Sequence, residues 1–413
     1  MRNYQILGRL FCERVLDASL LRTGGLKVLQ SLEHEVAQKT LQRIKDQTPC
    51  YLRLEDGSVF KGYSFGSRAC TSGEVVFSTS MVGYPEALTD PSYRGQILCL
   101  TYPMVGNYGV PSYAVKQEQV PVFFESDHIQ VRGLVVHEAC DFPNHHQSAR
   151  TIDEWLAQEK IPGIYGVDTR RLARILRERG VMLGAIQSND SNDLGKDFED
   201  PNKRDLVREV SVNKMMTYGA GKKHRVALID CGVKYGIIRN LLERKMTVLR
   251  LPYDATTDDV MRVKPRGVVV SNGPGDPKLC KSTIETIGEL IEAKVPILGI
   301  CLGNQLIALS EGADTYKMKY GHRSQNQPVI NFQTGRCYIT TQNHGYAIEK
   351  KALENAGLEV WFVNANDKSI EGVKHRKKPC WGVQWHPEAS PGPRDTEFIF
   401  DFFVKRMTRN AAA

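Results

Sequence analysis

The pattern of apolar and polar positions changes near Arg225. From there towards the C-terminus, short β-type apolar runs alternate with segments whose apolar residues recur at helical spacing. Alternating strands and helices indicate an α/β domain with a parallel, doubly wound sheet. Ligands of such sheets bind beyond the carboxyl ends of the strands. Strands are predicted at 226–229, 247–251, 267–270 and in the run ending at Ile300, and helices at about 237–244 and 283–292.

The N-terminal half has a different pattern. Residues 50–186 alternate β-rich runs with turns that contain glycine or proline, which indicates a mixed α/β domain. Residues 188–224 are rich in Asn, Asp, Lys and Gly and have little apolar periodicity. We therefore expect a first domain at 48–187, a connecting segment at 188–224 and a second domain at 225–407. Within the first domain, strands are predicted at 74–78, 96–102 and 130–137, and helices at 151–159 and 169–179, the latter capped by Asp168.

Composition supports two domains and excludes several classes of protein. A chain of 413 residues exceeds what one hydrophobic core usually organises. No apolar run approaches the roughly 18 residues of a membrane-spanning helix. The net charge of +8 is diffuse and its basic clusters carry no interleaved aromatic residues, so no nucleic-acid partner is expected. The ten cysteines show neither CxxC nor zinc-type spacing, which predicts a reducing compartment and no metal site.

Residues 1–47 stand apart from both domains. Their first thirty positions hold five basic residues against Glu13 and Asp17, and apolar residues recur there at helical spacing. A basic amphipathic N-terminus of this kind resembles a mitochondrial transit peptide, which predicts a location in the mitochondrial matrix. The acidic residues, including Glu33 and Glu35, favour an accessory helix and a cytoplasmic protein instead. Both interpretations stay open at this point.

Residues 297–309 carry the strongest chemical signal. Cys301 ends a β-type run and begins an apolar helix, with Gly299 and Gly303 two positions away on either side. This spacing is typical of a nucleophile elbow, a turn so tight that flanking side chains would clash. A thiol at a helix N-terminus is also favoured as the thiolate. A buried structural cysteine is the alternative interpretation.

A candidate base follows near the C-terminus, where His386-Pro-Glu388 ends a short alternating strand. A cysteine nucleophile needs a base within hydrogen-bond reach, and that base needs a third group to orient it. The His-x-Glu pair supplies both groups within three residues. The sequence therefore predicts a triad of Cys301, His386 and Glu388.

The motifs together resemble a known family. Gly299-Ile-Cys-Leu-Gly-Asn-Gln305 with His386-Pro-Glu388 is similar to the class I, or triad, glutamine amidotransferases. Additional motifs resemble the small, glutamine-hydrolysing chain of carbamoyl-phosphate synthetase over about residues 50–404. They include Val270-Ser-Asn-Gly-Pro-Gly-Asp-Pro277, Thr341-Gln-Asn-His-Gly-Tyr346, Gly83-Tyr-Pro-Glu-Ala-Leu-Thr-Asp-Pro-Ser-Tyr93 and Gly166-Val-Asp-Thr-Arg170.

The resemblance implies a reaction and a set of substrate contacts. Cys301 would attack the side-chain amide of L-glutamine, with Leu302 and the turn at 272–275 offering backbone N–H groups to the oxyanion. Ser92, from the first domain, would place the site at the domain interface. By matching to the family, the glutamine pocket would consist of Ser92, Gly273, Gly275, Leu302, Gln305, Asn343, Gly345 and Tyr346.

The resemblance also implies a partner. In this family a large synthetase chain uses ATP, with Mg, to make carbamoyl phosphate for arginine or pyrimidine synthesis. This sequence has no P-loop and needs no cofactor of its own. One alternative is a glutaminase that serves another synthetase, and the N-terminal half argues against it. The other alternative is a non-catalytic scaffold, and the intact triad argues against that. His344 is a second candidate base, and the chain departs from the common family pattern at Asn304 and Gln325.

Overall fold

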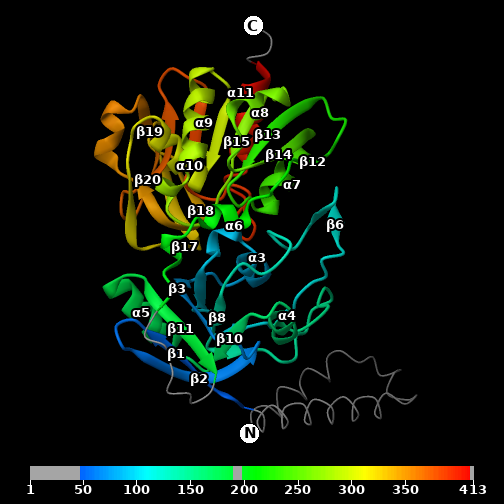
Figure 1. Cartoon of the computed structure of the whole chain (residues 1–413), viewed down its shortest axis with the longest axis vertical. Coiled ribbons are helices and arrows are strands. Elements are labelled where there is room, and N and C mark those ends of the chain that lie inside the picture. The colour runs from blue at the N-terminus through cyan, green and yellow to red at the C-terminus, as the bar shows by residue number, and fades with distance from the viewer. Residues whose placement is uncertain (1–46, 189–197, 410–413) are drawn as a thin grey trace, which may run out of the picture. The chain divides into compact units, whose positions relative to one another are not determined.

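The computed structural model describes residues 47–188 and 198–409, and residues 49–409 of these belong to one unit (Figure 1). The predicted N-terminal targeting segment, residues 1–47, lies outside the described residues except for its last position. No helix among the described residues is long and apolar enough to cross a membrane.

A closed barrel forms the centre of the first domain. Its seven strands follow the order β1-β11-β3-β4-β8-β10-β2, and closure results because β1 pairs with both β2 and β11. Alternate residues of β1, Cys50, Leu52 and Leu54, point into the core, as a strand with one buried face requires. The strands are β1 (Pro49–Leu54), β2 (Val59–Gly66), β3 (Thr71–Ser78), β4 (Gln96–Leu100), β8 (Gly133–Val135), β10 (Pro162–Tyr165) and β11 (Met182–Ser188).

Helices and short elements complete this domain. Helix α5 (Thr169–Arg179) has the predicted bounds, and the Asp168 side chain accepts a hydrogen bond from the backbone N–H of Arg171. Helix α4 (Ile152–Gln158) begins with a capping box in which Thr151 and Glu154 satisfy each other's backbone N–H groups. The remaining elements are α3 (Tyr84–Leu88), η2 (Pro91–Tyr93), β5 (Met104–Val105), β6 (Lys116–Gln117), β7 (Val120–Pro121) and β9 (Glu138–Ala139).

The second domain contains a ten-stranded sheet with the order β12-β14-β13-β15-β16-β21-β20-β19-β17-β18. The five strands from β14 to β21 in this order are parallel. β12 and β20 pair antiparallel with the two outer strands of this group, and β19, β17 and β18 continue the sheet from β20 by antiparallel pairing. The bounds are β12 (Met216–Tyr218), β13 (His224–Asp230), β14 (Met246–Pro252), β15 (Gly267–Val270), β16 (Ile297–Ile300), β17 (Thr315–Asn331), β18 (Cys337–Ile348), β19 (Leu358–Asn364), β20 (Ile370–His375) and β21 (Cys380–Val383).

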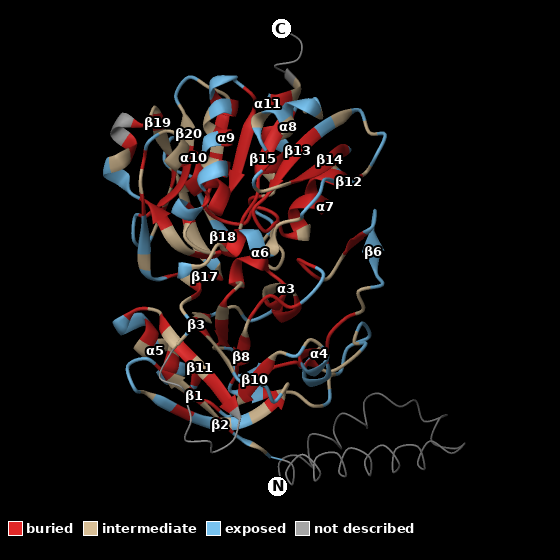
Figure 2. Cartoon of the chain, viewed as in Figure 1, coloured by how far each residue is buried: buried red, intermediate tan, exposed pale blue. Residues whose placement is uncertain are grey.

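Helices cover both faces of the parallel strands, as expected for a doubly wound sheet. Successive residues of β13 alternate between two apolar cores: Ala227 and Ile229 face one, and Val226 and Leu228 the other. The strands are accordingly buried on both sides (Figure 2). The first core holds α8 (Thr257–Arg262), α9 (Lys281–Glu292) and α10 (Leu302–Ser310), and the second holds α7 (Tyr235–Glu243) and α11 (Phe398–Arg409).

The described part of the predicted connecting segment, residues 198–224, contains regular structure. It includes η3 (Pro201–Lys203) and α6 (Leu206–Val210), and β12 adds an antiparallel edge strand beside β14. A strand of three residues is too short to show an alternating apolar pattern, and Tyr218 is its one buried residue. The other 3₁₀ turns are η4 (Pro277–Leu279) and η5 (Lys350–Asn355).

Candidate active site

Cys301 occupies the sharp turn between β16 and α10. Its backbone adopts φ 54° and ψ −102°, a conformation that costs a non-glycine residue about 1–3 kcal/mol and is typical of functional turns. A Cβ on Gly299 would clash with the carbonyl of Gly303, and one on Gly303 would clash with the carbonyl of Val270. The glycine spacing therefore has the steric cause expected from the sequence. The thiol lies 3.7 Å from the Asn343 carbonyl, and the Gln384 amide approaches the sulfur at the same distance.

His386 and Glu388 form a buried hydrogen-bonded pair. Nδ1 of His386 lies 2.7 Å from Oε1 of Glu388, and the backbone N–H of His386 donates to the Thr341 carbonyl. Because Nδ1 is committed to Glu388, Nε2 is the nitrogen left for Cys301, and a hydrogen bond with that thiol contributes to a raised pKa of His386. Burial disfavours the imidazolium, but the Glu388 carboxylate outweighs it and raises the pKa of His386 to about 10. The histidine is therefore held as a proton donor near neutral pH.

Lys234, which the sequence analysis missed, completes this charge cluster. Its Nζ lies 2.9 Å from Oε1 of Glu388 and donates to the Ser390 carbonyl at 2.7 Å, and its side chain is only 2% exposed. The pKa of Lys234 is raised overall: burial alone would lower it, but the surrounding carboxylates, above all Glu388, outweigh that effect. Burial likewise opposes ionisation of Glu388, yet Lys234 and His386 lower its pKa to about 2. Lys234 follows β13 at the carboxyl edge of the sheet. That position is the one feature of the sequence from which Lys234 could have been proposed as a site residue.

The N-terminal domain contacts this cluster through Glu125. Its carboxylate is fully buried, lies 2.6 Å from the Arg239 guanidinium and accepts from the Ser390 hydroxyl at 2.6 Å. It also accepts from the backbone N–H of Gly236 at 2.8 Å. Ser390 lies two residues after Glu388, so the loop that carries the acid of the triad is fixed partly by the barrel domain.

Backbone N–H groups for an oxyanion are available beside Cys301. Leu302 is the first residue of α10, where N–H groups have no intrahelical acceptor. The turn at Gly273 approaches this point closely: a Cβ there would lie 2.7 Å from a methyl carbon of Leu302 and would clash with the Cys231 carbonyl. Only glycine fits between them.

A pocket in the structure brings together Cys301 and all eight residues predicted to contact glutamine. His386 and Glu388 do not line it and lie behind the thiol. Gln305 donates to the Tyr346 carbonyl at 2.8 Å, which joins α10 to the opposite pocket wall on β18. The pocket also contains residues that were not predicted to contact glutamine: Glu74, Gln96, Val181, Asn202, Pro274, Lys317, Met318, Tyr320, Arg323 and His344, of which His344 was the second candidate base.

Ser92, which belongs to the barrel domain, lines this pocket. Its hydroxyl accepts a hydrogen bond of 2.9 Å from the Asn272 amide, and its backbone N–H donates to Asp90. The other oxygen of Asp90 accepts from the Asn343 amide at 2.9 Å. Residues of both domains therefore form the pocket wall.

We expect Ser92→Ala to weaken glutamine binding more than turnover. One hydrogen bond to a polar substrate contributes about 0.5–1.5 kcal/mol, so KM should rise roughly 2- to 10-fold with a smaller change in kcat. A glutamine titration of the variant measures this, and Ser112→Ala in the barrel domain outside the pocket serves as a control. An unchanged KM would leave Ser92 with a structural role only.

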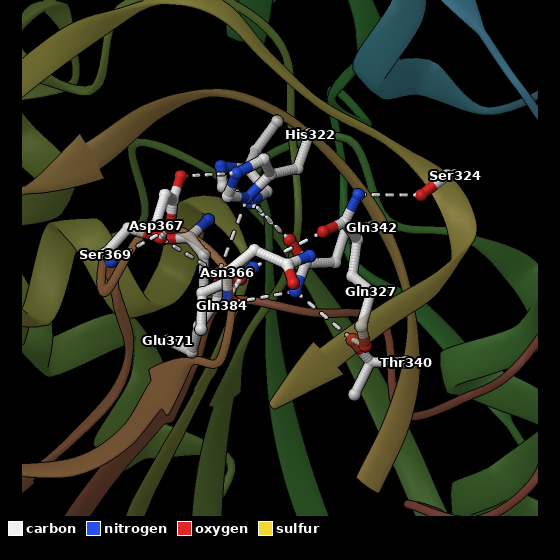
Figure 3. Close-up of polar contacts among 12 residues, drawn as sticks. His322, Ser324, Gln327, Thr340, Gln342, Asn366, Asp367, Ser369, Glu371 and Gln384 are labelled. Carbon is white, nitrogen blue, oxygen red and sulfur yellow. Dashed lines mark hydrogen bonds and ion pairs between the residues drawn. The ribbon is translucent and has the colours of Figure 1, made fainter. Parts of the chain in front are cut away.

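His344 is not placed as the base, because it belongs to a separate buried network. Figure 3 labels other members of that network, among them His322, Gln342 and Glu371. Its Nδ1 contacts the Tyr346 carbonyl at 2.8 Å and its Nε2 contacts the Gln342 side chain at 2.9 Å. Burial and the neighbouring His322 keep the pKa of His344 well below its usual value. Gln342 in turn donates from its NH₂ group to the Glu371 carboxylate at 2.8 Å, which holds its side chain against the ring. His344 thus acts as a fixed hydrogen-bonding group in the pocket wall.

The same network contains the one grouping of metal-ligand type found among the described residues. The ligand atoms of His322, His344 and Glu371 lie within 4.8 Å of one another. The Gln342 carboxamide contacts all three, at 3.0, 2.9 and 2.8 Å respectively. The protein itself therefore satisfies these groups, and Asp367 pairs with the far nitrogen of His322.

The two departures from the family pattern occupy supporting positions. Asn304 and Gln305 both donate to the Gln384 carbonyl oxygen at 3.2 Å, and Gln384 in turn contacts the Cys301 sulfur. Gln325 donates to the Val82 carbonyl of the barrel domain at 2.7 Å. The first position supports the nucleophile and the second contributes to the contact between the domains.

Comparison with known proteins identifies both halves of the chain. The family of class-I glutamine amidotransferases matches residues 227–406, and the CPSase domain of the carbamoyl-phosphate synthase small chain matches residues 52–186.

Relatives of known name agree over most of the chain. The carbamoyl phosphate synthase small chain of Pyrococcus furiosus is 47% identical over 362 residues, which cover 86% of this chain and 96% of that one. The small chain of Methanopyrus kandleri is 48% identical with similar coverage, 86% and 97%. An arginine-specific small chain from Aspergillus fumigatus is 42% identical over 408 residues, covering 97% of this chain and 89% of its own. The chain therefore belongs to the family of carbamoyl-phosphate synthase small chains, with a class I glutamine amidotransferase domain.

Proposed function

We propose that this chain hydrolyses L-glutamine to glutamate and ammonia, and that it passes the ammonia to a large synthetase chain. The observation that carries the proposal is the placement of Cys301. A strained elbow presents its thiol to a pocket that contains all eight expected glutamine contacts, and the buried His386–Glu388 pair lies behind it. A non-catalytic scaffold would have no need to maintain this arrangement.

Each step of the proposed hydrolysis has a group that can carry it out. The thiolate of Cys301 attacks the amide carbon, and backbone N–H groups at Leu302 and the Gly273 turn stabilise the oxyanion. Protonated His386 transfers its proton to the leaving nitrogen, which departs as ammonia and leaves a thioester. His386, now neutral, takes a proton from water as the water attacks the thioester. The carbon–sulfur bond then breaks, glutamate leaves, and the Cys301 thiolate and protonated His386 are restored.

A synthetase partner follows from membership in the small-chain family. We propose that it is the chain that binds ATP and Mg and forms carbamoyl phosphate, since this sequence has no P-loop. The association is a heterodimer or a higher oligomer in which the small chain contributes no cofactor.

We propose further that the product serves arginine synthesis and that residues 1–47 direct the protein to mitochondria. In support, the alignment with the arginine-specific relative leaves only about 12 residues of this chain uncovered, so it extends into this segment, whereas the archaeal small chains cover 86%. Imaging residues 1–47 fused to a fluorescent protein tests the location. A diffuse cytoplasmic signal would leave the accessory-helix interpretation.

The test of the main proposal is glutamate release with and without the large chain. We expect glutamine-dependent carbamoyl phosphate synthesis only when both chains are present, and ammonia-dependent synthesis from the large chain without glutamine. Absence of glutamate release in the reconstituted complex would contradict the proposal.

A further inference from the structure

Arg323 on β17 is a buried cation without an anionic partner. Its guanidinium is part of a residue only 6% exposed, and no ion pair among the described residues involves it within 4.0 Å. Its one side-chain hydrogen bond in this part of the structure joins Nη1 to the Tyr320 carbonyl at 2.6 Å, and Nε is unpartnered. Burial accordingly lowers the pKa of Arg323. A buried unpaired charge is costly, which indicates that a missing group completes this site.

The guanidinium lies in the wall of the glutamine pocket. Arg323 lines that pocket together with Cys301 and is the direct cross-strand partner of Asn343 in the β17–β18 ladder. A Cβ on Gly345 would lie 3.2 Å from Nη2 of Arg323. Two of the predicted glutamine contacts, Asn343 and Gly345, are therefore immediate neighbours of this charge.

The other cation in the pocket is already neutralised. Nζ of Lys317 lies 2.6 Å from the Glu74 carboxylate, and that carboxylate is also held by the amides of Gln96 and Asn202. Arg323 shares the pocket with this pair and feels the Glu74 carboxylate, which opposes the lowering of its pKa, but among the described residues it forms no ion pair with Glu74 within 4.0 Å. Of the two cations that line the pocket, Arg323 is the one whose charge is available to a ligand.

The chemistry of the substrate supplies the complementary group. When the side-chain amide of glutamine reaches Cys301, its α-carbon lies three carbon–carbon bonds further out and carries a carboxylate. An arginine offers a planar fork of N–H donors that matches a carboxylate in two places. Resting on the proposed function, we propose that Arg323 binds the α-carboxylate of glutamine and selects for a free amino acid over a glutamine residue within a peptide.

The experiment compares two ligands in the Cys301→Ser background, where binding is measured without turnover. The ligands are L-glutamine and its α-carboxamide, which lacks the negative charge and keeps the side chain. With Arg323 present, we expect glutamine to bind roughly 10- to 100-fold more tightly than the α-carboxamide, as for hydrogen bonds to charged groups. In Arg323→Met, glutamine should lose that advantage while the affinity for the α-carboxamide changes little.

Two further variants separate this role from a general effect of charge. Arg323→Lys keeps the charge but loses the planar fork, so it should retain only part of the discrimination. Lys319→Met removes an exposed cation from the same strand outside the pocket, and it should preserve the preference for glutamine. Loss of the preference in Lys319→Met and its retention in Arg323→Met would overturn the proposal.

Stability provides an independent control. Removing a charge that has no partner should not lower the free energy of unfolding of the ligand-free protein. A large loss of stability in Arg323→Met with unchanged discrimination would assign Arg323 a structural role and overturn the inference. If the parent chain released no glutamate from glutamine, the proposed function itself would fail. If it did, and Arg323→Met still preferred the carboxylate, only the inference about Arg323 would fail.

Discussion

Replacing Cys301 by serine is expected to abolish glutamate release while the fold stays intact. A hydroxyl is close in size to a thiol but far harder to ionise, so the variant lacks the nucleophile that the reaction needs. Residue 301 already adopts its strained backbone conformation at the elbow, and serine adds no atom to the buried turn. The measurement is glutamate release by the reconstituted complex, which we expect to fall by at least about 10³-fold, as for other nucleophiles that act as part of a unit.

The controls for Cys301→Ser separate chemistry from folding and from assembly. Cys337→Ser changes an exposed cysteine outside the pocket and should leave glutamate release unchanged. Ammonia-dependent carbamoyl phosphate synthesis by the complex should also survive in Cys301→Ser, because it bypasses the small-chain chemistry. Near wild-type glutamate release by Cys301→Ser would mean that another group is the nucleophile.

The parts of the molecule that follow local spacing could be predicted from the sequence. The glycines around Cys301 predict the elbow because the steric limit acts within five residues. The alternating β13 residues predict a strand buried on both faces, and the bounds of α5 follow from Asp168 and the apolar residues behind it. The expectation of a mixed α/β protein with a doubly wound second domain is confirmed.

The parts that depend on distant contacts could not be predicted in this way. Closure of the barrel requires β1 to pair with β11, about 130 residues further along the chain, and no periodicity encodes that choice. Lys234 and Glu388 are separated by 154 positions, and only the fold brings their charges to 2.9 Å. Arg323 gave no signal either, because a single arginine in a β-type run is usually exposed. The features that could be predicted are thus set by residues close in sequence. The residues that were missed are charged side chains that only the fold brings to the site.

Lys234→Met should have the second-largest effect, on both stability and turnover. Removing one partner of a buried ion pair typically costs about 3–5 kcal/mol, because the remaining charge is left buried with less compensation. The side chain of Glu388 is fully buried and, among the residues that the structure describes, would keep only His386 as a charged neighbour within 4.0 Å. A less firmly ionised Glu388 orients His386 less well, so kcat for glutamine hydrolysis should fall more than KM rises. Lys405→Met, which removes an exposed lysine of α11, is the matched control.

The pH dependence of unfolding identifies the mechanism of this loss. The pKa of Glu388 is about 2 in the folded state and roughly 4.3 in the unfolded state. The ionised carboxylate therefore stabilises the fold fully above about pH 4.3, and this stabilisation is lost as the pH falls towards 2. The pKa of His386 is about 10 in the folded state and roughly 6.5 in the unfolded state. The protonated imidazole therefore stabilises the fold fully below about pH 6.5, and this stabilisation is lost as the pH rises towards 10. In Lys234→Met the pKa of Glu388 should rise, and denaturant titrations between about pH 3 and 8 should show a weaker loss of stability on the acid side than in the parent. An acid limb identical to that of the parent, together with an unchanged kcat, would show that Lys234 does not hold the charge of Glu388.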